Sequence, residues 1–466
     1  MSRVVPLGVL VAALLTGCGR SCTGLDSDSP STDDSADDSS VDTAPPVADV
    51  AASIHEEQGS VVLVSWEQQG AATARVEYRQ DEGAWASTPQ RNVEAGPAQQ
   101  PILGIPYGEE LSYRLVLGEG DDSWTSAEGS IRTDDPPALI PTPDLLVAED
   151  SQQDPTAQYF VASINEDGAY FDGPWWTVIF DRSGRLVWAK QTPTGFCTLQ
   201  VQPTQDGTAI LVDHNSFWVS FDKGEASTVL RTTLDGAVQV EYAVPGLQHA
   251  FTETRDGLVL WGANTPNETL EEVTPEGEQR SIWSCDAFHD SLGIEHLCSS
   301  NHLFWHEPTD SVLFSFFNTV TVVEIDRQTG ESLRWFGDLP DAWAFEPEDS
   351  AFYWQHGVSY TDAGTLLLST EDERGGDETI VREYELNTGA EVLEQVWTFG
   401  LGDGLYSESH SDARRLPNGN TLHNLGSTAR LREATPDGTV VWDLDWGDSQ
   451  VLGFVTPIYD LYAMWP

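Results

Sequence analysis

Basic side chains are scarce in this 466-residue chain. It has 22 lysines and arginines against 76 aspartates and glutamates, and its formal net charge at pH 7 is −54. Such a negative field repels nucleic acid and anionic lipid headgroups, so both are excluded as electrostatic partners. The field also opposes anionic small molecules. A site for an anion must therefore gather some of the few cations locally.

Cysteines and long apolar runs are also few. The spacings of the five cysteines predict no zinc site, and we expect neither a metal nor a cofactor. Cys285 and Cys298 lie in a loop-like stretch and could form a disulfide in an oxidising compartment, whereas Cys197 is expected to be a buried thiol. Beyond residue 18, no run reaches the ~20 apolar residues of a spanning helix.

The N-terminus reads as a secretion signal. Arg3 is followed by an apolar run over residues 4–15, and Leu15-Thr16-Gly17-Cys18 matches a lipobox. We therefore expect residues 1–18 to end in a lipidated Cys18 that anchors the protein outside the cytoplasm, at the periplasmic face of the outer membrane or at the cell surface. An ordinary cleaved signal peptide is the alternative.

Two segments separate this signal from the main body of the chain. Residues 19–46 are rich in Asp and Ser and should form a disordered, self-repelling tether. Residues 47–134 alternate apolar and polar side chains in short runs, typical of strands in a small sandwich. Predicted strands are 61–66, 74–79 and 112–117. With a buried Trp66, this segment resembles a fibronectin type III module.

From residue 143 to 466 a repeat of about 50–55 residues takes over. A first series of turns, each opening an apolar strand, lies at Gly207, Gly257, Asp310, Gly364 and Gly419. A second series, often followed by a strand that ends in tryptophan, lies at Gly184, Gly236, Gly277, Gly330, Gly389 and Gly438. Several short strands in each repeat predict an all-β chain, and the six second-series turns predict a six-bladed β-propeller.

Four histidines share one register of this repeat. His249, His302, His356 and His410 each lie eight or nine residues before a first-series turn. We expect the apolar strand after that turn to be the innermost of its blade, which would bring the four rings together near one mouth of the central channel. The other histidines fall out of register and are interpreted as surface or structural residues.

Several segments of the repeat resemble the bacterial arylsulfate sulfotransferase family over roughly residues 150–466. They are Gln355-His356-Gly357 to Leu368, Val323 to Gly330, Arg415-Leu416-Pro417-Asn418-Gly419-Asn420-Thr421-Leu422, and Glu433 to Trp442. The resemblance implies a secreted or periplasmic propeller that moves a sulfuryl group from a phenolic sulfate to another phenol. It further implies a sulfated histidine as intermediate and no nucleotide donor.

The resemblance also implies roles for individual residues. By position, His410 resembles the nucleophile, while His249, His356 and Arg374 resemble the residues that hold the sulfuryl oxygens. His302 is in register but matches no family residue, so it is a possible channel-lining side chain. The segments Ser369–Arg374 and Ser300-Asn301-His302 depart from the family pattern.

Three alternatives stay open at this stage. A lipid-anchored propeller that only binds its ligand fits the same organisation. Four propeller histidines can also hold one iron, as in a metal oxygenase. A quinoprotein is suggested by Asp326, Thr329 and Gly330 before Trp335, although this pattern occurs clearly once.

Overall fold

The computed structural model describes residues 47–120, 123–165, 173–220, 223–264, 268–295, 298–447 and 450–466. They belong to one compact unit, Pro46–Pro466. The signal, Cys18 and the tether lie outside the described residues. The described chain is all-β apart from the helix α1 (Cys285–Leu292) and short 3-10 turns at Glu307–Thr309, Glu348–Ser350, Gly426–Thr428 and Tyr462–Met464. No helix in the described ranges is long and apolar enough to cross a membrane.

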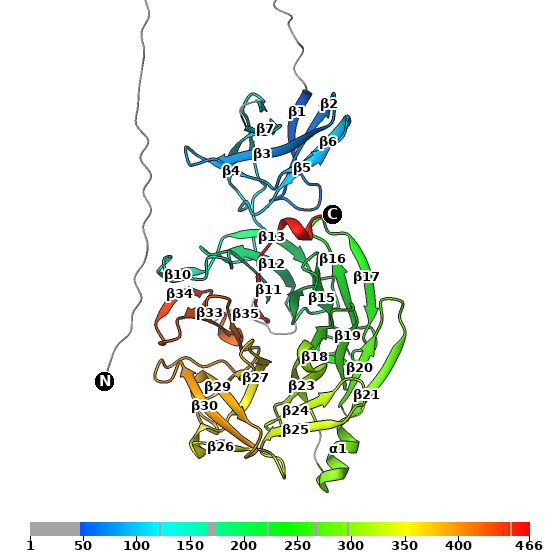
Figure 1. The fold of residues 1–466 in the computed structure, drawn as a ribbon, viewed down its shortest axis with the longest axis vertical. Coiled ribbons are helices and arrows are strands. Elements are labelled where there is room, and N and C mark those ends of the chain that lie inside the picture. Colours follow the sequence, from blue (N-terminus) through cyan, green and yellow to red (C-terminus); the bar gives the residue numbers. More distant parts are fainter. Residues whose placement is uncertain are drawn as a thin grey trace, which may run out of the picture. The chain divides into compact units, whose positions relative to one another are not determined.

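Residues 47–132 form two sheets (Figure 1). One contains β1 (Val47–Ile54), β2 (Val62–Gln68) and β6 (Gly96–Ile102); the other contains β3 (Ala72–Gln80), β4 (Ala86–Ser87), β5 (Arg91–Val93), β7 (Glu110–Leu117), β8 (Trp124–Thr125) and β9 (Gly129–Arg132). Alternating apolar side chains of both sheets meet in one core that contains Trp66 and Tyr113. The predicted strands at 61–66, 74–79 and 112–117 correspond to β2, β3 and β7.

After residue 143, the described residues form six sheets of four or five strands, a propeller-type arrangement (Figure 1). The first three sheets contain β11 (Tyr159–Asn165), β12 (Trp175–Asp181), β13 (Leu186–Gln191), β35 (Val451–Leu452) and β36 (Thr456–Ile458); β14 (Val201–Pro203), β15 (Ile210–His214), β16 (Thr228–Thr232) and β17 (Val238–Ala243); and β18 (Leu247–Glu253), β19 (Val259–Asn264), β20 (Glu268–Val273) and β21 (Gln279–Ser284).

The fourth to sixth sheets continue the same course. They contain β22 (Ser300–His306), β23 (Ser311–Phe316), β24 (Thr321–Asp326) and β25 (Ser332–Gly337); β26 (Ala344–Glu346), β27 (Tyr353–Tyr360), β28 (Leu366–Glu371), β29 (Thr379–Asn387) and β30 (Val392–Phe399); and β31 (Asp412–Arg415), β32 (Thr421–Leu425), β33 (Arg430–Ala434), β34 (Val440–Asp445) and β10 (Asp144–Ala148). Strand β18 contacts β22, β22 contacts β27, and β27 contacts β31, so these strands lie innermost.

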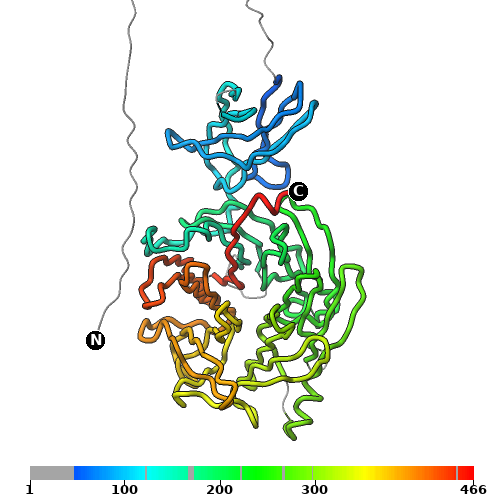
Figure 2. Tube along the Cα trace, viewed as in Figure 1, coloured from blue at the N-terminus to red at the C-terminus, as the bar shows by residue number. Residues whose placement is uncertain are grey.

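The first and last sheets each contain strands from the other end of the described chain. Strand β10 pairs with β34 and becomes the outer strand of the sixth sheet, whereas β35 and β36 pair with β11 on the inner side of the first. Figure 2 shows the C-terminal segment, in red, running back across the N-terminal sheets in cyan and green. This exchange pairs edge strands of both end sheets and closes the ring.

The two turn series take defined places in these sheets. All six second-series glycines lie between the third and fourth strands of a sheet. First-series turns lie between the innermost and second strands; only five occur in the described residues because the first sheet takes its innermost strands from the C-terminus. The apolar strand after each first-series turn is therefore the second strand. Our prediction that this second strand is innermost was wrong. The innermost strand is the one before the turn, on the side of the histidine.

The tryptophans of the outer strands link neighbouring sheets. The indole N–H groups of Trp188, Trp283, Trp397 and Trp442 donate to Leu234 O, Ser332 Oγ, Pro436 O and Arg182 O, each in the next sheet of the ring. A buried indole N–H needs such a partner. The repeated tryptophan therefore fixes how adjacent sheets pack.

The predicted loop around residues 285–298 contains the helix α1 instead. The Ser284 side chain accepts a hydrogen bond from Ala287 N at the start of this helix, and Gly293 ends it in a left-handed conformation. A serine cap and a closing glycine are helix signals that were present in the sequence. The structure joins Cys285 and Cys298 in a disulfide and buries the Cys197 thiol.

Candidate active site

The four in-register histidines lie around the axis of the propeller-type region. His249, His302 and His356 are on the innermost strands β18, β22 and β27, and His410 precedes β31 by two residues. His356 acts electrostatically on each of the other three rings. The ring centroids of His249 and His410 are 6.2 Å apart. Residues up to 161 positions apart in the sequence (His249 to His410) thus form one cluster.

His410 has an unusual backbone. Its φ of +58° lies in the left-handed region, which costs free energy for a residue with a Cβ. The Asn424 side chain donates to the His410 carbonyl oxygen at 2.9 Å and holds this conformation. Gly426 packs so closely that an added Cβ would overlap the His410 carbonyl oxygen and Cβ. The surrounding residues therefore fix the position of this ring.

Local hydrogen bonds orient the imidazoles. Ser409 Oγ lies 3.0 Å from His410 Nδ1, so this nitrogen is engaged beside its own backbone. His356 Nδ1 donates to the Trp354 carbonyl oxygen at 2.9 Å. His249 and His302 each make a backbone hydrogen bond through the other ring nitrogen, to Ser300 and Val358, and their buried Nδ1 atoms have no hydrogen-bond partner among the described residues.

Loss of hydration disfavours protonation of these rings; His302 and His410 are buried, and His249 and His356 are half-buried. Desolvation lowers the pKa of His249 and of His302 to about 3 and that of His356 to about 4. The pKa of His410 is lowered well below its ordinary value, first by burial and then by His249 and His356. These lowered pKa values favour the neutral form of His249 and His356 at pH 7, because the site removes water that would solvate the cation.

Arg374 is not part of this cluster. Its guanidinium pairs with Asp338 and lies 4.8 Å from the centroid of the Tyr353 ring, and its side chain is 57% exposed. Its recorded contacts are thus with Asp338 and Tyr353, and its role in holding sulfuryl oxygens stays a prediction. Arg374 lies beyond the end of β28, where solvent and an aspartate satisfy its charge.

The cation that does reach the histidines is Arg414. It lies on β31, acts electrostatically on His302, and pairs with the buried Asp412 at 3.0 Å. Sequence reasoning missed it, although Asp412 and Arg414 alternate as residues on one face of a strand do. That alternation was the available signal.

A second missed residue is the buried Glu268. Its carboxylate accepts from Ser300 N at 2.8 Å and from Ser300 Oγ at 2.6 Å, and Ser300 in turn bonds His249 through its backbone. Burial raises the Glu268 pKa to about 7. Glu268 thus positions the strand that orients His249, and no repeat or motif in the sequence marks it.

Two aromatic side chains border the histidines. Trp218 lies edge-on to His249 with centroids 4.9 Å apart, and its indole N–H donates to Gln248 O at 2.6 Å. Phe454 lies 5.1 Å from His302 and 6.3 Å from His410, measured between ring centroids. An aryl group entering the cluster would meet these faces, which suit ring stacking.

A cavity of about 1230 Å³ opens beside the cluster. Of the four histidines, His302 is the one that lines it, together with Arg414, turn residues and aromatic side chains such as Tyr360, Trp397 and Tyr459. This volume is large enough for small aromatic ligands. The cavity connects the histidine-bearing strands to the end of the sheets that carries the first-series turns.

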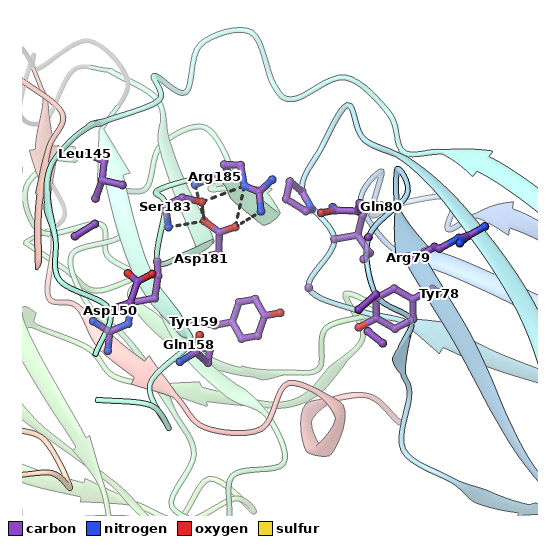
Figure 3. A pocket seen from close by; sticks show the side chains of 18 of the residues that line it. Tyr78, Arg79, Gln80, Leu145, Asp150, Gln158, Tyr159, Asp181, Ser183 and Arg185 are labelled. Atoms are coloured by element: carbon purple, nitrogen blue, oxygen red, sulfur yellow. Dashed lines mark hydrogen bonds and ion pairs between the residues drawn. The ribbon is translucent and has the colours of Figure 1, made fainter. Parts of the chain in front are cut away.

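A second pocket, of about 630 Å³, lies between residues of the two-sheet region and the first propeller sheet (Figure 3). Figure 3 shows Asp181 accepting hydrogen bonds from Ser183 and Arg185, while Tyr78 and Tyr159 face each other from opposite sides. Burial raises the Tyr159 pKa to about 12. None of the predicted site residues lines this pocket, and its Asp181 and Arg185 already neutralise each other.

Potential metal ligands converge elsewhere. Among the described residues, one group of three or more His, Cys, Asp or Glu side chains has donor atoms within 4.8 Å of one another: Cys285, His289 and Cys298. The four channel histidines do not form such a group, so their spacing does not match an iron centre of the oxygenase type.

Comparisons with known proteins give limited similarity. No protein-family model and no curated protein matches the chain. Among solved structures, a proposed 6-phosphogluconolactonase from Bacteroides uniformis is 13% identical, with 83% of this chain and 100% of that chain covered and a TM-score of 0.40. A protein from Lactobacillus plantarum is 10% identical, with 82% and 99% covered and a TM-score of 0.38. Similarity at this level transfers no activity.

Proposed function

We propose that the chain is a six-bladed β-propeller with a fibronectin type III-like module before it, anchored outside the cytoplasm through Cys18. We further propose that it is a sulfotransferase of the arylsulfate type, which moves a sulfuryl group from a phenolic sulfate ester to a phenolic acceptor. Six sheets, with ends closed by exchanged strands, support the blade count. The resemblance of segments around His356 and His410 supports the chemistry.

The histidine cluster is the observation that carries this proposal. A buried, neutral imidazole is the nucleophilic form of histidine, because its ring nitrogen keeps a lone pair. His410 has a lowered pKa, a fixed backbone and an Nδ1 beside Ser409 Oγ, and we assign the attack to Nε2. A purely structural role would not require a strained backbone at this point.

The first half-reaction transfers the sulfuryl group to the protein. His410 Nε2 attacks the sulfur of the donor, an N–S bond forms, and the bond from sulfur to the aryl oxygen breaks. The aryl group leaves as phenolate. The resulting sulfoimidazolium keeps its proton on Nδ1, and this N–H can donate a hydrogen bond to Ser409 Oγ. Arg414 is the nearby cation that can offset charge on the sulfuryl oxygens.

The second half-reaction regenerates the histidine. The acceptor phenol can donate a hydrogen bond to the buried Nδ1 of His249, which has no partner among the described residues. The phenol oxygen attacks sulfur, and the N–S bond to His410 breaks. The phenol proton passes to solvent, so the cycle ends with neutral imidazoles and a new sulfate ester.

The test is incubation of the full chain with 4-nitrophenyl sulfate, followed by phenol. We expect release of 4-nitrophenolate, formation of phenyl sulfate, and a sulfuryl adduct on His410 by mass spectrometry of the donor-treated protein. His410→Asn should abolish the adduct and turnover. His55→Asn, which changes a histidine of the two-sheet region, is the matched control and should retain both.

Failure of every tested donor to give either turnover or an adduct would contradict the enzyme proposal. Donor or phenol binding without reaction would instead support the alternative of a binding propeller, for which the cavity of about 1230 Å³ provides room. Turnover retained in His410→Asn would place the nucleophile elsewhere.

A further inference from the structure

A cluster of three metal-binding side chains lies outside the channel. Cys285 is the first residue of α1, His289 follows one helical turn later on the same face, and Cys298 precedes β22 by two residues. All three are buried. Figure 1 shows α1 at the periphery of the ring, away from the innermost strands that carry the channel histidines.

The imidazole faces both sulfur atoms at a defined distance. His289 Nε2 lies 3.6 Å from Cys285 Sγ and 3.6 Å from Cys298 Sγ. In a tetrahedral zinc site, bonds of ~2.3 Å to sulfur and ~2.0–2.1 Å to nitrogen place these ligand atoms about 3.6 Å apart. The sulfur-to-nitrogen spacing of the cluster therefore matches a zinc site. His289 Nδ1 is also close, at 3.7 Å and 3.9 Å from the two sulfurs, so the ring must turn to direct one nitrogen at the metal.

The surroundings hold this arrangement. The walls are apolar and include Trp283 and Phe288, whose ring lies 6.0 Å from that of His289, centroid to centroid. The Ser284 cap fixes the start of α1 and hence the position of Cys285. A disulfide needs no imidazole beside it. A histidine directed at both sulfurs inside an apolar pocket is, by contrast, what a Cys₂His metal site requires.

We propose that Cys285, His289 and Cys298 form a redox-gated site for a thiolate-binding metal ion of the Zn²⁺ class. In the oxidised form the S–S bond closes the site. A dithiol reductant opens it by donating two electrons and two protons to the protein and becoming a disulfide itself. The two protein thiols then release two protons to solvent as the metal binds, and water completes the coordination.

The two sulfurs must separate for this, because zinc-bound sulfurs lie about 3.8 Å apart. The Cα atoms of the two cysteines are 6.4 Å apart. Side-chain rotation about Cα–Cβ is the movement the site needs, and α1 can keep its place.

The experiment measures zinc binding by the full chain before and after dithiol reduction. The reduced protein, freed from reductant under anaerobic conditions, is titrated with Zn²⁺ and analysed for bound metal. We expect one tightly bound zinc in the reduced protein and none at this site in the oxidised protein. Co²⁺ as a second probe should give the near-ultraviolet charge-transfer band of thiolate ligands.

Variants separate this site from weak binding to the many surface carboxylates. His289→Gln should weaken zinc binding by at least the ~10- to 100-fold that loss of a supporting side chain around a metal costs. Cys197→Ser, which removes the buried thiol outside the cluster, should leave binding unchanged. Circular dichroism checks that each variant is folded.

Two results would overturn the proposal. One is a reduced protein that binds no zinc above the level of the Cys285→Ser/Cys298→Ser double variant. The other is Co²⁺ binding by the unmodified reduced protein without a thiolate band, which does not depend on any variant folding. Both measurements follow metal binding and not sulfuryl transfer, so their results do not depend on the proposed activity.

Discussion

At the scale of single residues, the histidine cluster uses burial to select one protonation state. His302 is buried, and the positive charge of Arg414 further disfavours protonation of the His302 ring. Neutral rings suit nucleophilic attack and can accept hydrogen bonds, but they cannot neutralise an anion. Arg414 supplies the positive charge instead. Imidazole rings with lowered pKa values stay neutral at pH 7, whereas a guanidinium stays charged, so the two groups take different roles.

This state has a consequence for stability against pH. An unfolded histidine takes up a proton near pH 6.5, whereas His302 in the folded protein does so at about 3. Between these values the unfolded state binds more protons, so stability is lost as the pH falls below about 6.5. Within this pH window, each such histidine adds ~1.4 kcal/mol per pH unit to the loss in the free energy of unfolding.

We expect His302→Asn to reduce that slope by about this amount between about pH 6 and about pH 4.5. Denaturant unfolding at fixed ionic strength measures it. The pKa values of Asp213 and Glu268 are raised to about 7, so these carboxyls increase stability as the pH falls. Their contribution is the same in the variant and the unmodified protein and cancels when the two slopes are compared. An unchanged slope in the variant would mean that His302 is solvated and titrates normally.

The strained backbone of His410 gives a second prediction. Gly426→Ala places a methyl group against the His410 carbonyl oxygen and Cβ, so the His410 backbone must move. We expect a loss of ~1–3 kcal/mol in the free energy of unfolding and a larger fall in kcat than in stability-matched variants. Gly70→Ala, where an added Cβ has nothing within 4 Å, should change neither. Full activity in Gly426→Ala would show that the left-handed conformation is dispensable.

At the scale of elements, glycine and tryptophan positions were the informative signals. The second-series glycines mark the turn between third and fourth strands in all six sheets because that turn needs a positive φ, except at Gly389. The innermost strands could not be assigned from apolar content, because they carry polar residues such as Gln355 and His356 toward the axis. Helix α1 was missed because eight residues are too short for a helical period to stand out.

A buried ion pair contributes to the contact between the first and sixth sheets. Arg182 pairs with Glu433, whose side chain is fully buried, and stacks over Trp442 at 4.8 Å from the ring centroid. Arg182→Met keeps the apolar packing but leaves the carboxylate without its cation, so we expect a loss of ~3–5 kcal/mol in the free energy of unfolding.

Arg185→Met is the matched control in the same turn. Its partners are Asp181 and, at 3.7 Å, Glu109; its side chain is 45% exposed, and each such exposed pair should be worth ~0–1 kcal/mol. Equal destabilisation by the two substitutions, measured by denaturant unfolding, would contradict a special role for the pair that joins the two end sheets.

The site itself was predictable only in part. The repeat register placed four histidines at equivalent points, and the structure brings them together. Register could not reveal Glu268, which acts through Ser300, nor could it show that Arg374 faces Asp338 instead of the channel. Both depend on side-chain direction at strand ends, which the period of the sequence does not encode.

At the scale of the whole molecule, the net charge of −54 works against the proposed donor. A sulfate ester is an anion, so it must approach through a repulsive field before it reaches Arg414. Salt shortens the range of this field from ~30 Å at 0.01 M to ~8 Å at 0.15 M ionic strength. The buried histidines and the reacting sulfuryl group are screened much less.

We therefore expect the KM for 4-nitrophenyl sulfate to fall on the order of 3- to 10-fold when salt is raised over this range, the low end of electrostatic steering effects. The kcat should stay nearly constant, because chemistry occurs inside the site. The KM for phenol, which is neutral, is the internal control and should not change. Initial rates with each substrate varied in turn provide the measurement. A donor KM that rises with salt would mean that local cations around Arg414 already outweigh the field of the whole protein at the channel mouth.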